Sequence, residues 1–150
     1  MTACPDTSFL CAFYVKQSNS PSAAAHAATM TEPLHITAFL AYEFRQSLRF
    51  QTWRHSANPR EGISPADARA AFLQLEKDLA NGVAVLTPCS FHEVFRLADD
   101  LSKQYTADNG HRSFDILHVA AALYLGAKEF LTFDANQRKL AAAEGLIVKP

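Results

Sequence analysis

The sequence has little glycine, little cysteine and no long uncharged apolar run. Five glycines beside 26 alanines in 150 residues favour helices over a turn-rich β protein. The cysteines show no CxxC spacing and are too few for a disulfide framework: Cys4, Cys11 and Cys89. The longest apolar stretch, residues 116–127, is too short to cross a bilayer. We therefore expect reduced thiols, no membrane segment and a cytoplasmic location.

Neither sign of charge dominates the composition. The formal net charge of −1 excludes a globally basic nucleic-acid binder but leaves room for a local basic patch. Apolar residues make up 49% and charged residues 19%, which excludes a disordered polyelectrolyte. A chain of 150 residues is long enough to bury a substantial core without disulfides or structural metal. We expect a single domain over residues 1–150.

Short apolar segments alternate with helical patterns along the chain. Residues 34–36, 83–86, 130–133 and 146–148 are apolar runs with the length of strands. Side chains that favour helix N-termini stand at five places: Thr7 or Ser8, Thr37, Ser64, Ser90 and Ser113. Unbroken apolar strands between helices are typical of a parallel sheet covered on both faces. We predict the α/β class, as a three-layer α/β/α sandwich with a short, mostly parallel sheet.

Three carboxylates stand at unusual places in this pattern. Asp6 follows a short opening strand predicted over residues 1–5, and Asp134 follows residues 130–133. Ligands bind outside the carboxyl ends of such strands. Glu43 falls within the apolar stripe of the helix after Thr37, a stripe that includes Phe50. A carboxylate on an inward face is costly unless it is paired or binds metal. A buried salt bridge, or a place at the rim of the stripe, is the alternative for Glu43.

Asp115 is a fourth acid in an apolar setting. The helix predicted from Phe114 to Leu125 is apolar nearly all round, which is typical of a buried helix. Asp115 lies in its first turn, where the helix dipole favours the ionised form. The alternative is that Asp115 only supports the helix start. His118, one turn further on, fits a buried core histidine as well as it fits a ligand.

Convergence of these four acids at one cleft would create a strongly negative site. Crowded carboxylates raise one another's pKa unless a cation compensates. Mg²⁺ or Mn²⁺ prefers oxygen ligands of this kind, polarises a phosphoryl oxygen and activates a water. That chemistry is hydrolysis of a phosphodiester.

A basic block follows Glu43 directly. Residues 44–60 contain no acid and four arginines: Arg45, Arg49, Arg54 and Arg60. Arginines bind phosphate in a bidentate manner, and Trp53 in the same block could stack on a base. Arg112, three residues before Asp115, is a further phosphate-binding candidate. The alternative is a solvated helix face with Trp53 in the core.

Four segments together resemble the PIN domain family. Residues 6–10, DTSFL, are similar to its opening signature, and Glu43 stands where its second acid is expected. Residues 112–120, RSFDILHVA, resemble its third-acid helix, and residues 130–134, FLTFD, its fourth-acid segment. The resemblance covers essentially the whole chain in the expected order. It is closest to VapC-type toxins of bacterial type II toxin–antitoxin pairs.

The resemblance implies a metal-dependent endoribonuclease that cleaves RNA with a metal-activated water. Four acids would hold Mg²⁺ or Mn²⁺: Asp6, Glu43, Asp115 and Asp134. Three hydroxyl side chains would orient these acids by hydrogen bonds: Thr7, Ser8 and Thr132. The charge pattern described above adds three arginines as candidates for RNA binding: Arg45, Arg49 and Arg112. The implied partners are the RNA substrate, a VapB-type antitoxin protein and a second copy in a homodimer.

Two departures and two alternatives stand beside this interpretation. Pro5 cannot donate a ladder hydrogen bond, so the first strand is short or has Pro5 at its end. Gln46 stands where many members carry Asn.

A haloacid dehalogenase-type hydrolase needs an acid where Ser8 stands. A catalytically silent PIN-fold module for RNA binding or protein interaction usually has eroded acids, and all four are present here.

Overall fold

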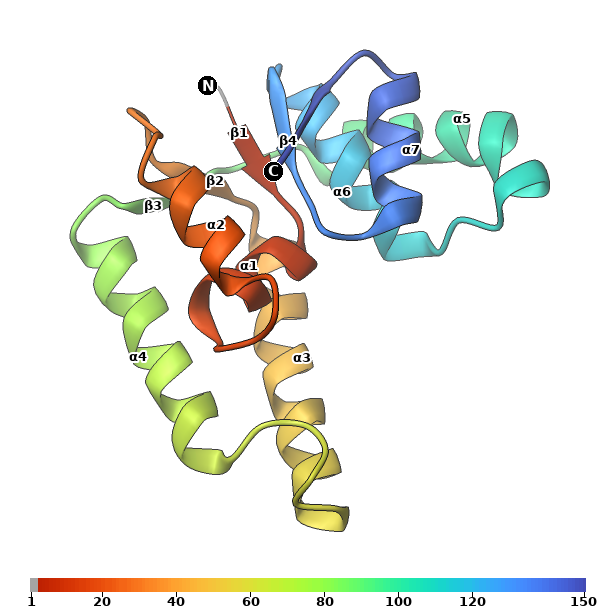
Figure 1. The fold of residues 1–150 in the computed structure, drawn as a ribbon. Helices are drawn as coiled ribbons and strands as arrows, with labels where there is room; N and C mark the ends of the chain where they lie inside the picture. The colour runs from red at the N-terminus through yellow and green to blue at the C-terminus, as the bar shows by residue number, and fades with distance from the viewer. Residues whose placement is uncertain (1–2) are drawn as a thin grey trace.

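The structure is a computed structural model that describes residues 3–150 (Figure 1). Its strands are short: β1 (Ala3–Pro5), β2 (Leu34–Ile36), β3 (Ala84–Leu86), β4 (Glu129–Leu131) and β5 (Ile147–Lys149). Its helices are α1 (Thr7–Tyr14), α2 (Ser20–Ala27), α3 (Ala38–Ala57), α4 (Pro65–Ala80), α5 (Phe91–Asn109), α6 (Ser113–Tyr124) and α7 (Ala135–Ala143). No helix within residues 3–150 is both long and apolar enough to cross a membrane.

All strand pairs are parallel, and β1 lies at the centre. One sheet has the order β1–β4–β5, and β2 pairs with β3 in a second sheet. β2 lies beside β1, but no strand pairing joins the two within residues 3–150. Pro5 is the last residue of β1 and has no N–H to offer a neighbour. The first strand is thus both short and ended by proline, and Met1 and Thr2 lie outside the described residues.

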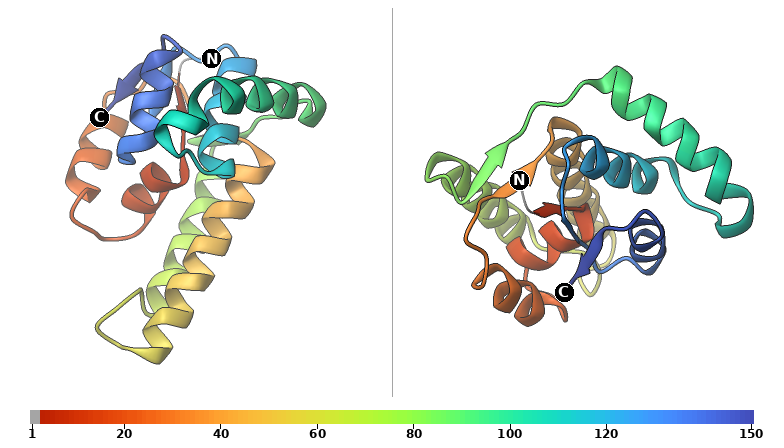
Figure 2. Two further views of the ribbon diagram at one scale, coloured as in Figure 1. Left: turned by 90° about the vertical axis from the view of Figure 1, so that its right-hand side faces the viewer. Right: turned by 90° about the horizontal axis from the view of Figure 1, so that it is seen from above.

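Helices cover both faces of the strands, which confirms the three-layer α/β/α prediction. Successive strand residues point to opposite faces. Ala3 and Leu131 accordingly join a core with α1 to α4, whereas Cys4 and Phe130 join a core with α5 to α7. Viewed from above, α1 and α2 lie on one side of the strands and α5 and α6 on the other (Figure 2). The central strand β1 is buried throughout, whereas the outer strands β3 and β5 are partly exposed.

The helix starts differ from the predictions at two places. Thr37, Ser64 and Ser90 cap α3, α4 and α5 as expected. Asp6, not Thr7 or Ser8, caps α1, because its carboxylate already accepts the N–H of Phe9. Ser113 lies inside α6, whose N-cap Arg112 makes no side-chain cap. The chain therefore passes from β1 into α1 with no loop, and Asp6 is fixed at the junction.

α3 and α4 run side by side and extend away from the strands as an arm (Figures 1 and 2). Phe50 was expected on the inward stripe, but it is 51% exposed, because α3 there has left the body of the protein. Trp53 is 63% exposed, which contradicts the alternative of a core position. The outer half of α3 thus offers aromatic side chains to solvent.

Gly62 closes the outer end of the arm, and we expect Gly62→Ala to destabilise it. Gly62 has φ +66°, and a Cβ there would overlap the carbonyl oxygen of Gln51 on α3. Gly82 also has a positive φ, of +74°, but open space surrounds it. Urea unfolding should show a loss of about 1 kcal/mol for Gly82→Ala and about 3 kcal/mol for Gly62→Ala. Equal losses would contradict the close packing of this turn.

Candidate functional site

A cleft of about 420 Å³ opens where β1, β4 and α6 present polar residues to the inner half of α3. Its lining includes three of the four predicted acids: Glu43, Asp115 and Asp134. Thr7 and Ser8 also line it. We call this the acid cleft. Residues more than 90 positions apart in sequence meet there, because parallel strands end at the same edge and α6 begins beside them.

Asp6, the fourth acid, lies fully buried next to the cleft and is held by three donors. Oδ1 accepts hydrogen bonds from Ser8 Oγ (2.7 Å) and from the Phe9 N–H (2.9 Å), and Oδ2 accepts one from Thr132 Oγ1 (2.6 Å). Burial raises the pKa of Asp6, and the hydrogen bonds from Thr132, Phe9 and Ser8 oppose that rise. Ser8 also accepts the Phe133 N–H, so this network ties β1 to the end of β4.

Glu43 meets two donors at the opposite wall of the cleft. Its Oε2 accepts a hydrogen bond from Thr7 Oγ1 and lies 2.5 Å from His118 Nε2. The His118 ring is buried and stacks on Phe39 at 5.4 Å. Burial raises the pKa of Glu43, but the His118 and Thr7 hydrogen bonds and the His118 and Arg112 charges outweigh it, so the pKa lies below its ordinary value. Glu43 is therefore ionised. Its side chain is partly exposed on α3 and lies beside His118.

Arg112 joins the two remaining acids. Its Nε donates to Asp115 Oδ2 at 2.8 Å, and its Nη2 lies 3.7 Å from Asp134 Oδ2. The hydrogen bond with Asp115 is the main cause of a raised Arg112 pKa. Asp134 also caps α7 by accepting the N–H groups of Asn136 and Gln137. Arg112, expected to bind phosphate, thus serves as the counterion of two carboxylates.

Gln137 is a cleft residue whose role the sequence did not indicate. Its Nε2 donates to Asp115 Oδ1 at 3.3 Å, and its Oε1 is buried with no hydrogen-bond partner among residues 3–150. A buried amide oxygen without a donor is costly, so an electropositive group is the natural complement at this place. One sequence signal could have identified Gln137. It lies three residues after the N-cap Asp134, and residues at that spacing share one face of a helix.

The chemistry of the donor set fits a hard divalent cation. Carboxylate and amide oxygens surround the cleft, and the Gln137 oxygen lacks a partner. In the present arrangement Arg112 pairs with Asp115, and His118 lies within hydrogen-bond distance of Glu43. No group of three His, Cys, Asp or Glu side chains within residues 3–150 is close enough to hold one ion. A cation held by Asp115 would therefore compete with the Arg112 guanidinium for that carboxylate.

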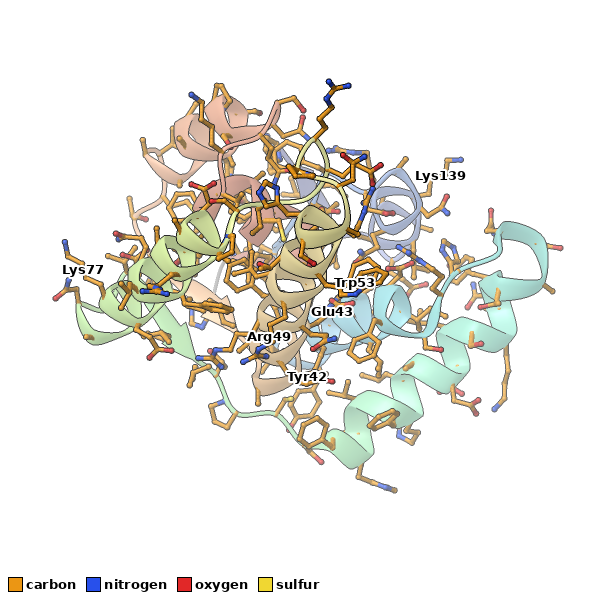
Figure 3. The ribbon with its side chains drawn as sticks, turned by 90° about the horizontal axis from the view of Figure 1, so that it is seen from below. Tyr42, Glu43, Arg49, Trp53, Lys77 and Lys139 are labelled. Carbon is orange, nitrogen blue, oxygen red and sulfur yellow. The ribbon has the colours of Figure 1, made fainter. Side chains whose placement is uncertain are left out.

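The other two predicted arginines, Arg45 and Arg49, lie on α3, and Figure 3 labels Arg49. Arg45 points towards α4, where it forms an ion pair with Glu76 at 2.7 Å. Arg49 lies over the Phe72 ring at 5.6 Å. Neither lines the acid cleft, so of the three only Arg112 is placed at the acids.

Comparisons with known proteins agree with this architecture. VapC20 from Mycobacterium tuberculosis, described as a Sarcin-Ricin loop cleaving toxin, has a similar structure, with TM-score 0.63 and 18% identity over 99% of this chain and 100% of that one. FitAcB from Neisseria gonorrhoeae gives TM-score 0.63 and 14% identity over 99% and 97%. No curated protein matches in sequence. The model of the PIN domain family matches residues 3–143. The chain therefore belongs to the PIN domain family.

Proposed function

We propose that this protein is a metal-dependent endoribonuclease that hydrolyses RNA phosphodiester bonds. The observation that carries the proposal is the acid cleft, where Glu43, Asp115 and Asp134 converge from three separate segments. Asp6 lies directly behind it on the Ser8 and Thr132 hydroxyls. Membership of the PIN domain family and a fold shared with a toxin described as cleaving the Sarcin-Ricin loop support the same activity.

The four acids, with Gln137, would hold Mg²⁺ or Mn²⁺. When bound, the ion activates a water and polarises the scissile phosphate. The chain's own residues fix the carboxylates: Thr7 and His118 hold Glu43, while Ser8 and Thr132 hold Asp6. The Arg112 side chain is 76% exposed at the cleft, so it can turn from Asp115 to a phosphate oxygen.

The biological role that fits this activity is that of a VapC-type toxin. A VapB-type antitoxin would then inhibit the enzyme by occupying the acid cleft. We also propose a homodimer, because Phe91 and Phe95 on α5 are about half exposed and contact each other, whereas the other large apolar side chains of α5 pack against the core. Sedimentation of the purified, antitoxin-free protein measures that assembly directly.

The proposal is tested by incubating antitoxin-free protein with a structured RNA and Mg²⁺ or Mn²⁺. A denaturing gel should show discrete fragments with either metal and intact RNA in EDTA. Binding of the RNA without cleavage in either metal would contradict the nuclease. It would favour the other reading of this family, a catalytically silent RNA-binding or interaction module.

A further inference from the structure

Two exposed aromatic rings stand beside the acid cleft on α3. Phe50 lines the cleft and is 51% exposed, and Trp53 is 63% exposed. The two rings stack at 5.5 Å between centroids with an interplanar angle of 30°. Neither belongs to either core cluster of the protein. The outer face of this aromatic pair is therefore available for a further ring.

The same stretch of α3 carries positive charge. Tyr42, Arg49 and Trp53 are spaced by seven and four residues, so they share one stripe of the helix. In Figure 3, Trp53 and Glu43 lie on the side of α3 that faces α6, and Arg49 lies nearer α4. Within residues 3–150, Glu76 and Glu61 pair with Arg45 and Arg54, whereas no carboxylate pairs with Arg49. Arg49 thus lies one helical turn from Trp53 and over the Phe72 ring, without a carboxylate partner among residues 3–150.

We propose that Phe50 and Trp53 form a stacking platform for an unpaired base of RNA, with Arg49 contacting its phosphate. The substrate class is single-stranded or looped RNA, whose bases are free to leave the helix and stack on aromatic rings. Because Phe50 also lines the acid cleft, a base stacked on this platform would place the adjoining phosphodiester near the carboxylates. The role of the platform as a substrate site rests on the proposed nuclease, but its binding of RNA is measurable without cleavage.

RNA is favoured over a protein segment by the combination of groups. A stacked aromatic face binds any base through its ring, and an unpaired arginine binds the anionic backbone beside it. The chain from 44 to 60 holds no acid that would repel that backbone. The aromatic face and the absence of nearby acids in this segment both suit RNA, which combines a negatively charged backbone with flat bases.

The platform can be tested directly, because Trp53 is the only tryptophan of the chain. Fluorescence is recorded in the Asp115→Asn background with Mg²⁺, while an unstructured RNA hexamer is added. A hexamer of abasic residues, with the same charge, is the control ligand. We expect quenching by the RNA but not by the abasic chain. Phe50→Ala should weaken binding about tenfold, as expected for loss of one stacking contact.

Two matched variants separate stacking and charge from general surface effects. Tyr124 is an exposed aromatic residue at the far end of α6, and Lys77 is an exposed cation on α4, on the far side of α3 in Figure 3. We expect Arg49→Ala to weaken binding, and Tyr124→Ala and Lys77→Ala to leave it unchanged.

Three results would overturn the platform. The first is that the abasic chain quenches Trp53 fluorescence as much as RNA does. The second is that RNA binds, as measured by fluorescence anisotropy of a labelled RNA, without changing Trp53 fluorescence. The third is that acrylamide fails to quench Trp53 fluorescence even before RNA is added. The last result would assign the aromatic pair to an interface with a second copy or a protein partner. Base-dependent quenching together with uncut RNA in the wild type would keep the platform and reject the nuclease.

Discussion

Asp115→Asn should abolish metal-dependent RNA cleavage while leaving the fold intact. Asp115 lies in the first turn of α6 and lines the acid cleft, so its charge faces the place of the proposed ion. Loss of residues that only support metal ligands typically costs 10–100-fold, so loss of a ligand should cost at least about a hundredfold. The partner Arg112 is largely exposed, so the free energy of unfolding should fall by no more than about 1 kcal/mol.

Initial rates of RNA cleavage in Mg²⁺ measure the effect, with circular dichroism as the check of folding. Asp108→Asn is the matched control, because Asp108 is an exposed acid near the end of α5 and does not line the cleft. It should cleave like the wild type. Full activity of Asp115→Asn would remove Asp115 from the site.

Asp6→Ala should destabilise the protein more than any other change among the four acids. The change leaves the Ser8 and Thr132 hydroxyls and the Phe9 N–H without their acceptor at a fully buried position. Each buried donor without a partner costs about 1–3 kcal/mol, and since the hydroxyls can rotate we expect a total of about 3–5 kcal/mol. Urea unfolding followed by circular dichroism measures this loss.

Two other substitutions separate the cap from the charge. Asp134 also caps a helix but is partly exposed, so Asp134→Ala should cost only about 1 kcal/mol. Asp6→Asn keeps an acceptor oxygen and removes a charge that burial disfavours, so it should be far milder than Asp6→Ala. A loss for Asp6→Ala no larger than that for Asp134→Ala would show that the buried network contributes little.

The sequence predicted the layers and the cleft acids because both follow from backbone geometry. Asp6 and Asp134 come directly after strands, and parallel strands end at one edge. Glu43 was conspicuous only against the apolar stripe of α3, and the structure gives it His118 as a partner. The Glu43 side chain is 29% exposed, so the structure fits the alternative of a place at the rim of the stripe, with His118 as a hydrogen-bond partner.

The remaining features depend on contacts that periodicity does not encode. Phe50 follows the inward spacing of α3, but the arm carries it past the core, so its exposure could not be predicted. The pairing of Arg112 with both Asp115 and Asp134 depends on how α6 meets the start of α7. Burial of Asp6 depends on Thr132, which is 126 residues away in sequence.

Binding of Mn²⁺ tests the central claim most directly, since the cleft acids must exchange Arg112 for a cation. The electron paramagnetic resonance signal of free Mn²⁺ is followed as antitoxin-free protein is added, for the wild type, Asp115→Asn and Asp108→Asn. We predict saturable loss of the free signal with the wild type and Asp108→Asn, and binding at least about tenfold weaker with Asp115→Asn. An unchanged free signal with the wild type, or equal binding by all three proteins, would contradict a metal centre in the acid cleft.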